Sequence, residues 1–357
     1  MTDFLNGLTL NHLFYEEVAA PLLRSNFPEL EFSAALIGWG SDVLGYDDVQ
    51  STDHNCGPRF QLFLAEGDFE KYYTAINEAL NAGLPSEFRG YPTVYSIVVE
   101  DVAGPVRYNI EVETIKSFFI RYLGCDPFRE IEAATWLTFA EHKLLAVTSG
   151  KVFHDGLNEL EAIRQKFSYY PKDVWLYMLA AQWEKISEEE AFVGRSGFVG
   201  DELGSILIAA RQVKNLMRLC FLMERKYVAY SKWFGTAFSH LDCAQELASI
   251  FMQVLQASEW QARQEFLARA YEIVARMHNA LGIIIPLKEA ATPYHERPYL
   301  VMGDNRYIEE LRNALTSEEV TRIKHNLGSV NQFVDSNDRL NNIELCKKLK
   351  ELYVQDL

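Results

Sequence analysis

The sequence predicts an α+β protein, in which an N-terminal mixed sheet with helices is followed by a mainly α-helical part. Short strand-like apolar runs bounded by turn residues occur in the first third of the chain. From about residue 126 onward, apolar residues recur instead at helical spacing. Because 48% of the 357 residues are apolar, the chain can bury a large core. We predict three domains, at 1–125, 126–290 and 291–357.

The first part is expected to alternate helices and strands. Residues 12–24 read as a helix that ends before Pro28, and 32–37 and 59–64 read as strands. A helix is expected over 67–80, followed by strands at 93–99 and 106–112. Ala103-Gly104-Pro105 is the predicted turn between those last two strands.

Three long helices are expected in the second part. They begin at Asp173, near Asp201 and at Ser258, and the last ends at Gly282. After it, the tail is expected to form short helices and loops.

Charge and composition exclude several classes of protein. The net charge of −16 argues against broad nucleic-acid binding and against an anionic membrane surface, since both require a positive field. The five cysteines form no CxxC pair, and no apolar run approaches the length of a membrane helix. The N-terminus lacks the pattern of a signal peptide. We therefore expect a cytoplasmic protein with no membrane association, although a small anionic ligand remains compatible with the sequence.

A glycine-serine turn between the first two strands predicts a phosphate site. Gly40-Ser41 directly follows the first strand, and Asp53 comes eleven intervening residues later, ahead of the second. Glycine lets the backbone approach a phosphate closely, and the serine hydroxyl adds a donor. A carboxylate at the next strand can bind Mg²⁺, which bridges triphosphate oxygens.

A further pair of acids lies on the later strand. In "RYNIEVET", Glu111 and Glu113 alternate with Ile110 and Val112, so the acids share one strand face and the apolar residues share the other. This alternation is typical of a charged site against a buried sheet, although a solvated strand face produces the same pattern.

Together these motifs resemble the nucleotidyltransferase (polymerase-beta-like) superfamily, which carries a Gly-Ser turn, two acids one residue apart and a third acid on a later strand. Longer stretches resemble the bacterial domain-of-unknown-function family 4037. They are "GSDVLGYDD", "STDHNCGPRFQLFL", "FHDGLNEL", "YYPKDVWLYMLAAQWEKISEEEAFVGR", "GDELGS" and "YSKWFGTAF". The resemblance covers most of the chain and weakens in the tail.

The resemblance implies ATP or another nucleoside triphosphate as substrate and Mg²⁺ as cofactor. It assigns the metal to Asp53 and Glu111, with Glu113 as a further candidate acid, and the triphosphate to Gly40 and Ser41. One position departs from the family pattern, because Asn55 stands where relatives have a second acid, and an amide offers Mg²⁺ an oxygen without a charge. Neighbouring Asp42 could compensate.

The helical part supplies the remaining candidates. Glu190 continues the apolar face of Trp183 and Ile186, which suits a general base of raised pKa; a solvated helix end or a pair with Arg195 is the alternative. Lys232, which lies in a stretch that matches the family, and Arg195 are candidate nucleotide contacts.

A row of four cations lies on the helix that begins near Asp201. A solvated face whose cations pair with acids of the preceding helix is favoured over phosphate binding. The row consists of Arg211, Lys214, Arg218 and Arg225.

The expected function is Mg²⁺-dependent transfer of AMP from ATP to a hydroxyl of a small molecule or protein. Kanamycin-type nucleotidyltransferases, which resemble this arrangement, bind the acceptor between two such parts. Because the metal motif is degenerate at Asn55, the alternative is a catalytically weakened nucleotide sensor on the same fold. A purely structural scaffold is the least favoured possibility. The sequence identifies neither the acceptor nor the oligomeric state.

Overall fold

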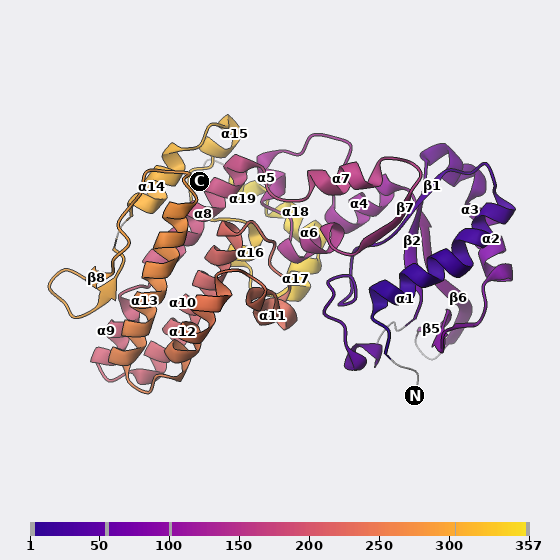
Figure 1. The fold of residues 1–357 in the computed structure, drawn as a ribbon. Coiled ribbons are helices and arrows are strands. Elements are labelled where there is room, and N and C mark those ends of the chain that lie inside the picture. Colours follow the sequence, from indigo (N-terminus) through magenta and orange to yellow (C-terminus); the bar gives the residue numbers. More distant parts are fainter. Residues whose placement is uncertain (1–3, 54–56, 100–101, 304, 355–357) are drawn as a thin grey trace. The chain divides into compact units, whose positions relative to one another are not determined.

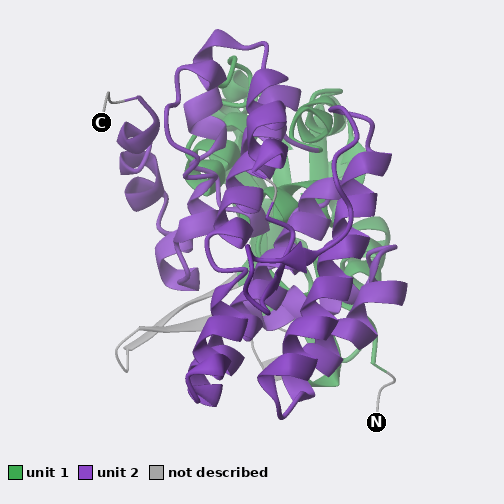
Figure 2. Cartoon of the chain, turned by 90° about the vertical axis from the view of Figure 1, so that its left-hand side faces the viewer, with its two compact units in different colours: residues 1–131, 143–168 green, residues 132–142, 169–357 purple. Residues whose placement is uncertain are grey.

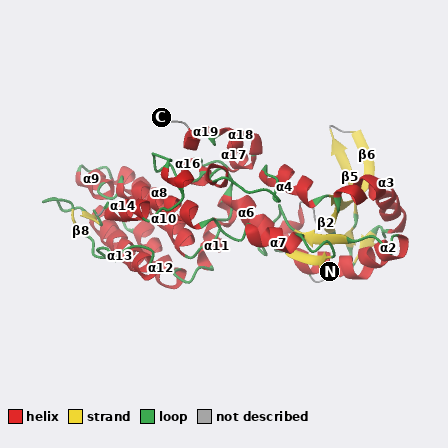
Figure 3. Cartoon of the chain, turned by 90° about the horizontal axis from the view of Figure 1, so that it is seen from above, coloured by secondary structure: helices red, strands yellow, loops and turns green. Residues whose placement is uncertain are grey.

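The computed structural model describes residues 4–53, 57–99, 102–303 and 305–354, with the backbone alone at 52–53, 95–99 and 102–107. Its contacts divide the chain into two compact units (Figure 2). Unit 1 comprises 1–131 and 143–168, and unit 2 comprises 132–142 and 169–357. Residues 143–168, which the sequence placed on the helical side, thus pack with the N-terminal part. The predicted α+β class with a mainly helical second part is confirmed (Figure 3).

Unit 1 contains a mixed sheet of five strands in the order β5-β6-β2-β1-β7 (Figure 1). The pairing of β2 with β6 is parallel, and the other neighbours are antiparallel. The strands are β1 (Phe32–Leu36), β2 (Arg59–Leu64), β5 (Val94–Val99), β6 (Val102–Glu113) and β7 (Lys151–Asp155). A separate pair is formed by β3 (Glu87–Phe88) and β4 (Tyr91–Pro92).

Helices pack on both faces of this sheet. Those of unit 1 are α1 (Gly7–Phe14), a π-helical turn (Tyr15–Ala19), α2 (Ala20–Asn26), the 3₁₀ helix Val49–Asp53, α3 (Glu66–Gly83), α4 (Ile115–Leu123) and α7 (Leu160–Lys166). α6 (Glu141–Thr148) begins in unit 2 and ends in unit 1.

The core of unit 1 lies between one face of the sheet and the helices α1 to α3. Phe60 and Leu62 of β2 and Ile110 of β6 are buried there against Phe14 and Leu80. The predicted alternation along β6 is confirmed, since Ile110 and Val112 enter this core. The acids between them therefore lie on the opposite face.

Two predictions about strands are wrong. Residues 103–105, predicted as a turn, lie within β6, where Ala103 pairs with Val98. Pro105 is tolerated because the register shifts here: Ala103 pairs with Val98 and Val106 with Ser96, so Gly104 and Pro105 lie at a bulge between these pairs. The sequence also placed no strand after residue 126, whereas β7 pairs with β1. Its few apolar residues give too short a pattern to recognise.

Unit 2 is built from helices and one short strand pair. Its longer helices are α8 (Lys172–Ser187), α10 (Glu202–Met223), α12 (Ala244–Gln256) and α13 (Trp260–Ala280). Of these, α8, α10 and α13 confirm the three predicted long helices, and α12 was not predicted. The shorter elements are α5 (Ala133–Trp136), α9 (Phe192–Phe198), the 3₁₀ helix Ser231–Trp233, α11 (Phe234–Ser239), β8 (Thr292–Pro293), β9 (Leu300–Val301), α14 (Arg306–Asn313), α15 (Glu318–Thr321), α16 (Val330–Phe333), α17 (Asn337–Asn341), α18 (Ile343–Lys348) and α19 (Glu351–Val354).

Helix α10 is central to unit 2, since it packs against α8, α9, α12 and α13. Trp175 and Trp183 of α8 are buried, as predicted for core residues. Within the described part of the chain, no helix is long and apolar enough to cross a membrane.

Candidate functional site

The turn that follows β1 requires glycine. Gly38 and Gly40 adopt φ values of +90° and +128°, which residues with a side chain rarely adopt. A Cβ atom at Gly40 would also collide with the carboxylate of Asp42 and the guanidinium of Arg59. The predicted triphosphate turn is therefore held from the side by an ion pair, and Ser41 lies half-buried within it.

Arg59, the first residue of β2, holds this turn. Its side chain is buried, with 5% exposed. Nη2 donates to Oδ1 of Asp42 at 2.7 Å and to the carbonyl oxygen of Trp39 at 2.8 Å. The guanidinium also lies 4.4 Å from the centre of the Trp39 ring. Asp42 is thus already paired with a cation, and its predicted role beside a metal would require it to leave Arg59.

The acids of β6 share a sheet face with Arg59. In the parallel pairing, Asn109 lies opposite Arg59, Glu111 opposite Gln61 and Glu113 opposite Phe63. Partners in a register point to the same side of a sheet. We call this side, with Arg59, Gln61, Glu111 and Glu113, the polar face of the sheet.

Helix α4 brings an arginine to the two acids. It begins immediately after β6, where Thr114 and Ser117 form a capping box. Arg121, in its last turn, therefore lies over the polar face. Its Nη2 donates to Glu111 at 2.8 Å and to Glu113 at 2.6 Å.

Glu113 is the more buried of the two acids, with 9% of its surface exposed. Burial raises the pKa of Glu113 to about 7, even though Arg121 acts in the opposite direction. Glu111, the neighbouring like charge, contributes to the increase. Glu113 is thus the carboxyl group on the polar face that exchanges a proton near neutral pH.

A pocket of about 600 Å³ lies along the edge of β6 that faces away from β2. Helix α3 supplies one wall, with Asn77 and Glu78, and Arg121 lies at the other. Its described lining residues include three carboxylates, Glu78, Glu111 and Glu113, and one cation, Arg121. Its volume suits a small-molecule ligand, but its charge repels an anion that arrives without a counterion.

Tyr122 lies close to both Arg59 and Arg121. Burial raises the pKa of the Tyr122 phenol, while both Arg59 and Arg121 are close enough to lower it. Lys143 adds a third cation, since its ammonium lies 5.1 Å from the centre of the Tyr122 ring. The arginine that holds the Gly40 turn and the arginine that binds the β6 acids are therefore both close enough to act on Tyr122.

The predicted metal ligands are only partly described. Asp53 ends the 3₁₀ helix Val49–Asp53, with only its backbone described, and Asn55 lies outside the described residues. Among the described residues, no group of three acidic, histidine or cysteine side chains could hold a metal ion. The metal assignment to Asp53, Asn55 and Glu111 stays a prediction.

Glu190, the predicted general base, lies in unit 2. It follows the end of α8, has 6% of its surface exposed, and accepts a hydrogen bond from the backbone N–H of Gly303 at 3.1 Å. Burial raises the pKa of Glu190 to about 7. It is neither solvated nor, among the described contacts, paired with Arg195. A catalytic role stays a prediction, whereas the contact with Gly303 is a structural one.

The other predicted contacts also lie in unit 2. Arg195 on α9 and Lys232 in the 3₁₀ helix are exposed, and the ammonium of Lys232 lies 4.8 Å from the centre of the Trp233 ring. The predicted pairing of the cation row with acids of the preceding helix fits Arg211 alone, which pairs with Glu189 just after α8. Lys214 pairs instead with Asp335 and Arg218 with Glu141, both distant in the sequence. Arg225 instead packs over the rings of Tyr169 and Trp175.

Sequence reasoning missed both arginines of the polar face. Arg59 stands directly after Gly57-Pro58, and its position at the start of a buried strand was the available signal, since a buried cation requires a partner. Arg121 lies eight residues after Glu113 in an amphipathic helix, and nothing in the sequence distinguishes it from a solvated arginine.

Comparison with known proteins gives one family and one distant structure. Residues 136–234 match the family model described as "Domain of unknown function (DUF4037)". No curated protein matches the sequence. A crystal structure of a nucleotidyltransferase-like protein from Exiguobacterium sibiricum is 11% identical, with 86% of this chain and 89% of that chain covered, at a TM-score of 0.32. The predicted resemblance to family 4037 is confirmed over this matched segment, residues 136–234, which are similar to the family model.

Proposed function

We propose that this chain is a nucleotidyltransferase-like protein that binds the magnesium complex of ATP on the polar face of unit 1 and transfers AMP to a hydroxyl group. The acceptor would be a small molecule or a protein. One observation carries the proposal. The parallel pairing of β2 and β6 puts Glu111 and Glu113 on the same sheet face as Arg59, and Arg59 hydrogen-bonds to the turn that contains Gly40. The order of turn, acid segment and later acid that the sequence suggested is thereby compatible with one site.

The charges of this face favour a nucleotide that arrives with its metal ion. Three carboxylates line the pocket, so a bare triphosphate would be repelled. The described carboxylates do not themselves form a resident magnesium site, because Glu111 and Glu113 bind Arg121 and Asp42 binds Arg59. Magnesium therefore enters the proposal as part of the magnesium–ATP substrate.

The proposed reaction is a substitution at the α-phosphorus. The acceptor oxygen forms a bond to this phosphorus, the bond to the β-phosphate oxygen breaks, and pyrophosphate leaves. The hydroxyl proton passes to a base. Glu113 is the candidate on the polar face, since its pKa of about 7 lets it accept a proton near neutral pH. Arg59 and Arg121 would hold phosphate oxygens and orient the nucleotide.

The arginine contacts also support the second candidate, a nucleotide sensor without transfer. Arg121 pairs with both β6 acids, which makes these acids less available for catalysis. This pairing favours nucleotide binding without transfer. Asn55, which replaces an acid of the family pattern, acts in the same direction. Both candidates require nucleotide binding, and they differ in whether pyrophosphate is released.

Calorimetry with ATP, with and without Mg²⁺, tests the shared requirement. We expect binding only with Mg²⁺, weakened about tenfold or more by Asp53→Ala and by Arg59→Met, since Asp53 is the predicted metal ligand and Arg59 holds the Gly40 turn. Lys71→Gln is the matched control, because Lys71 lies on α3 outside the lining of the pocket and should change nothing. Absence of ATP binding by the wild-type chain would refute both candidates.

Pyrophosphate release separates the two candidates. Labelled ATP is incubated with Mg²⁺ and a metabolite and protein extract that supplies acceptors. Release that Asp53→Ala abolishes supports transfer, and Asn55→Asp should preserve or increase it. Binding without release, in wild type and Asn55→Asp alike, supports the sensor.

A further inference from the structure

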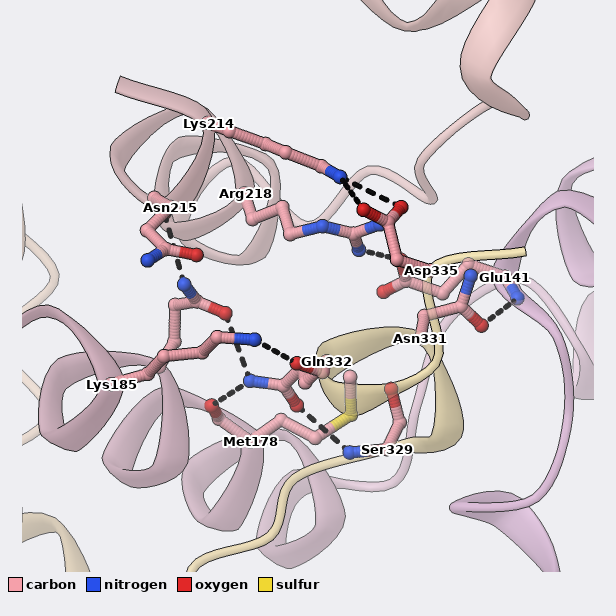
Figure 4. Close-up of polar contacts among 11 residues, drawn as sticks. Glu141, Met178, Lys185, Lys214, Asn215, Arg218, Ser329, Asn331, Gln332 and Asp335 are labelled. Carbon is pink, nitrogen blue, oxygen red and sulfur yellow. Dashed lines mark hydrogen bonds and ion pairs between the residues drawn. The ribbon is translucent and has the colours of Figure 1, made fainter. Parts of the chain in front are cut away.

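Unit 2 contains a second charged pocket, which none of the functions above uses. It has a volume of about 340 Å³ and lies between α8, α10 and the segment 331–335 (Figure 4). Its lining carries four cations, Lys185, Arg211, Lys214 and Arg218, and Asp335 as its carboxylate. In a chain of net charge −16, this is a local excess of the opposite sign.

The cations converge because of helix geometry. Arg211, Lys214 and Arg218 are spaced by three and four residues on α10, so they share one face of that helix. Lys185 approaches from α8, and Figure 4 shows its side chain pointing toward Gln332. Two neighbouring helices thus direct their charges at the same space.

Two of the cations are anchored from outside the pocket. Nη1 of Arg218 lies 3.2 Å from Oε2 of Glu141, a buried carboxylate, and Nε of Arg211 lies 2.7 Å from Oε2 of Glu189. These pairs hold the guanidinium groups in place. Because each guanidinium has five N–H donors, donors remain for a ligand.

Lys185 is the least compensated cation. Its ammonium donates to the carbonyl oxygen of Gln332, and within the described part of the chain it forms no ion pair. Burial lowers the pKa of Lys185, and the nearby charges of Arg218 and Lys214 lower it further. An anion in the pocket would relieve this repulsion.

The carboxylate of Asp335 marks the place in this pocket where a negative charge is stabilised. Its two carboxylate oxygens lie 2.8 and 2.9 Å from Nζ of Lys214. The hydrogen bond from Lys214, with the charges of Arg218 and Lys185, lowers the pKa of Asp335. Since its side chain is 84% exposed, Asp335 lies at the mouth and can turn away without leaving a buried cavity.

Two further features suit a ligand. Nδ2 of Asn215, a residue that lines the pocket, is buried and has no acceptor within the described part of the chain. Ala210, Phe333 and Val334 provide apolar wall beside the cations. A phosphate with a small organic group would use both kinds of surface.

We propose that this pocket binds the phosphate group of a small anionic molecule through Lys185, Lys214 and Arg218, in competition with the carboxylate of Asp335. The site lies wholly within unit 2 and does not depend on the function proposed for the polar face of unit 1.

Calorimetric titration of inorganic pyrophosphate into the full chain, in magnesium-free buffer, tests the site. We expect saturable binding that Lys185→Gln and Lys214→Gln each weaken about tenfold, because each removes one charge-assisted contact. Asp335→Asn should tighten binding several-fold, since it removes the competing charge. Lys347→Gln is the matched control, an exposed lysine paired with Glu344 on α18, and should bind as the wild type does.

Several outcomes would overturn the proposal. They are the absence of saturable binding, binding that both pocket lysine variants leave unchanged, and weaker binding by Asp335→Asn. Tighter binding of succinate than of pyrophosphate would refute the assignment to phosphate. Because Lys214 and Asp335 are exposed, their variants should fold, and thermal unfolding checks these variants and the half-buried Lys185→Gln. Asp53→Ala separates this site from that of unit 1, since it should leave pyrophosphate binding unchanged.

Discussion

Acids outnumber cations in the pocket beside β6 in unit 1, whereas cations outnumber acids in the pocket beside α10 in unit 2. Among the described lining residues, the first has three carboxylates and one arginine, whereas the second has four cations and one carboxylate. In the first, a single guanidinium binds both Glu111 and Glu113. In the second, Asp335 binds Lys214 and leaves Lys185 without a carboxylate among the described contacts.

In each pocket, burial and like charges shift the pKa of one group toward its neutral form. Burial raises the pKa of Glu113, and the like charge of Glu111 adds to this. Burial lowers the pKa of Lys185, and the like charges of Arg218 and Lys214 add to this. A cation beside Glu113 and an anion beside Lys185 would reverse these effects. Under the two proposals, the pocket of unit 1 therefore takes the metal ion carried by the nucleotide, and the pocket of unit 2 takes a free anion.

The largest expected effect tests how the cations of unit 2 are anchored. Arg218→Met would leave Glu141 buried without a counter-charge, so the free energy of unfolding should fall by about 3 kcal/mol at neutral pH. Denaturation in urea measures the loss. Adding Glu141→Gln to this variant should recover part of it, because the second change removes the unpaired charge.

Arg211→Met is the control for this prediction. Arg211 pairs with Glu189 at the surface, so its loss should cost less than about 1 kcal/mol. Equal losses for the two arginine variants would contradict the anchoring role of Glu141.

Glu190 is a buried carboxylate that pairs with no arginine among the described contacts. It therefore tests the effect of burial on a carboxyl pKa apart from the effect of an arginine. The pKa of Glu190 is raised to about 7, above its unfolded value, so the folded state holds its proton more tightly. Its stabilising effect is complete below the unfolded pKa and is lost as pH rises through about 7. Glu190→Gln should therefore become more stable relative to wild type by about 2 to 3 kcal/mol as pH rises from about 5 to about 8.

Denaturation at several pH values measures this difference. The amide introduced by Glu190→Gln keeps an oxygen for the N–H of Gly303, so the hydrogen bond should persist. Glu188→Gln, at a nearby position outside the core, should show no such trend. A pH-independent difference for Glu190→Gln would contradict the raised pKa.

The smallest expected effect concerns the single arginine of unit 1 that binds both β6 acids. Arg121→Gln should lower the free energy of unfolding by about 1 to 2 kcal/mol at about pH 8, because half-exposed Arg121 is partly screened by solvent. At about pH 5.5 the loss should be smaller, since Glu113, with its raised pKa, is then protonated.

Arg129→Gln provides the comparison for Arg121. Arg129 pairs with Asp126 on the surface and should cost less than about 0.5 kcal/mol at either pH. A loss for Arg121→Gln that does not change with pH would show that Glu113 stays ionised throughout.

The elements were largely predictable, whereas the contacts at the candidate site were not. The strand alternation that separates Glu111 from Ile110 follows from backbone geometry and could be read directly. The turn predicted at 103–105 failed because proline is excluded from regular strand pairing but not from a bulge, and the register shift that creates the bulge is a property of the assembled strand pair. β7 was missed because only its pairing with β1 identifies it as a strand.

The sequence by itself determined the α+β order, the long helices and the faces on which the acids of β6 and the cations of α10 lie, because these depend on periodicities of two and 3.6 residues. Only the tertiary structure decided which charges meet. Lys214 and Asp335 are 121 residues apart, and Arg59 and Asp42 meet across a turn in which only a glycine fits at position 40. Such pairs depend on how distant segments pack, and local spacing carries no information about that.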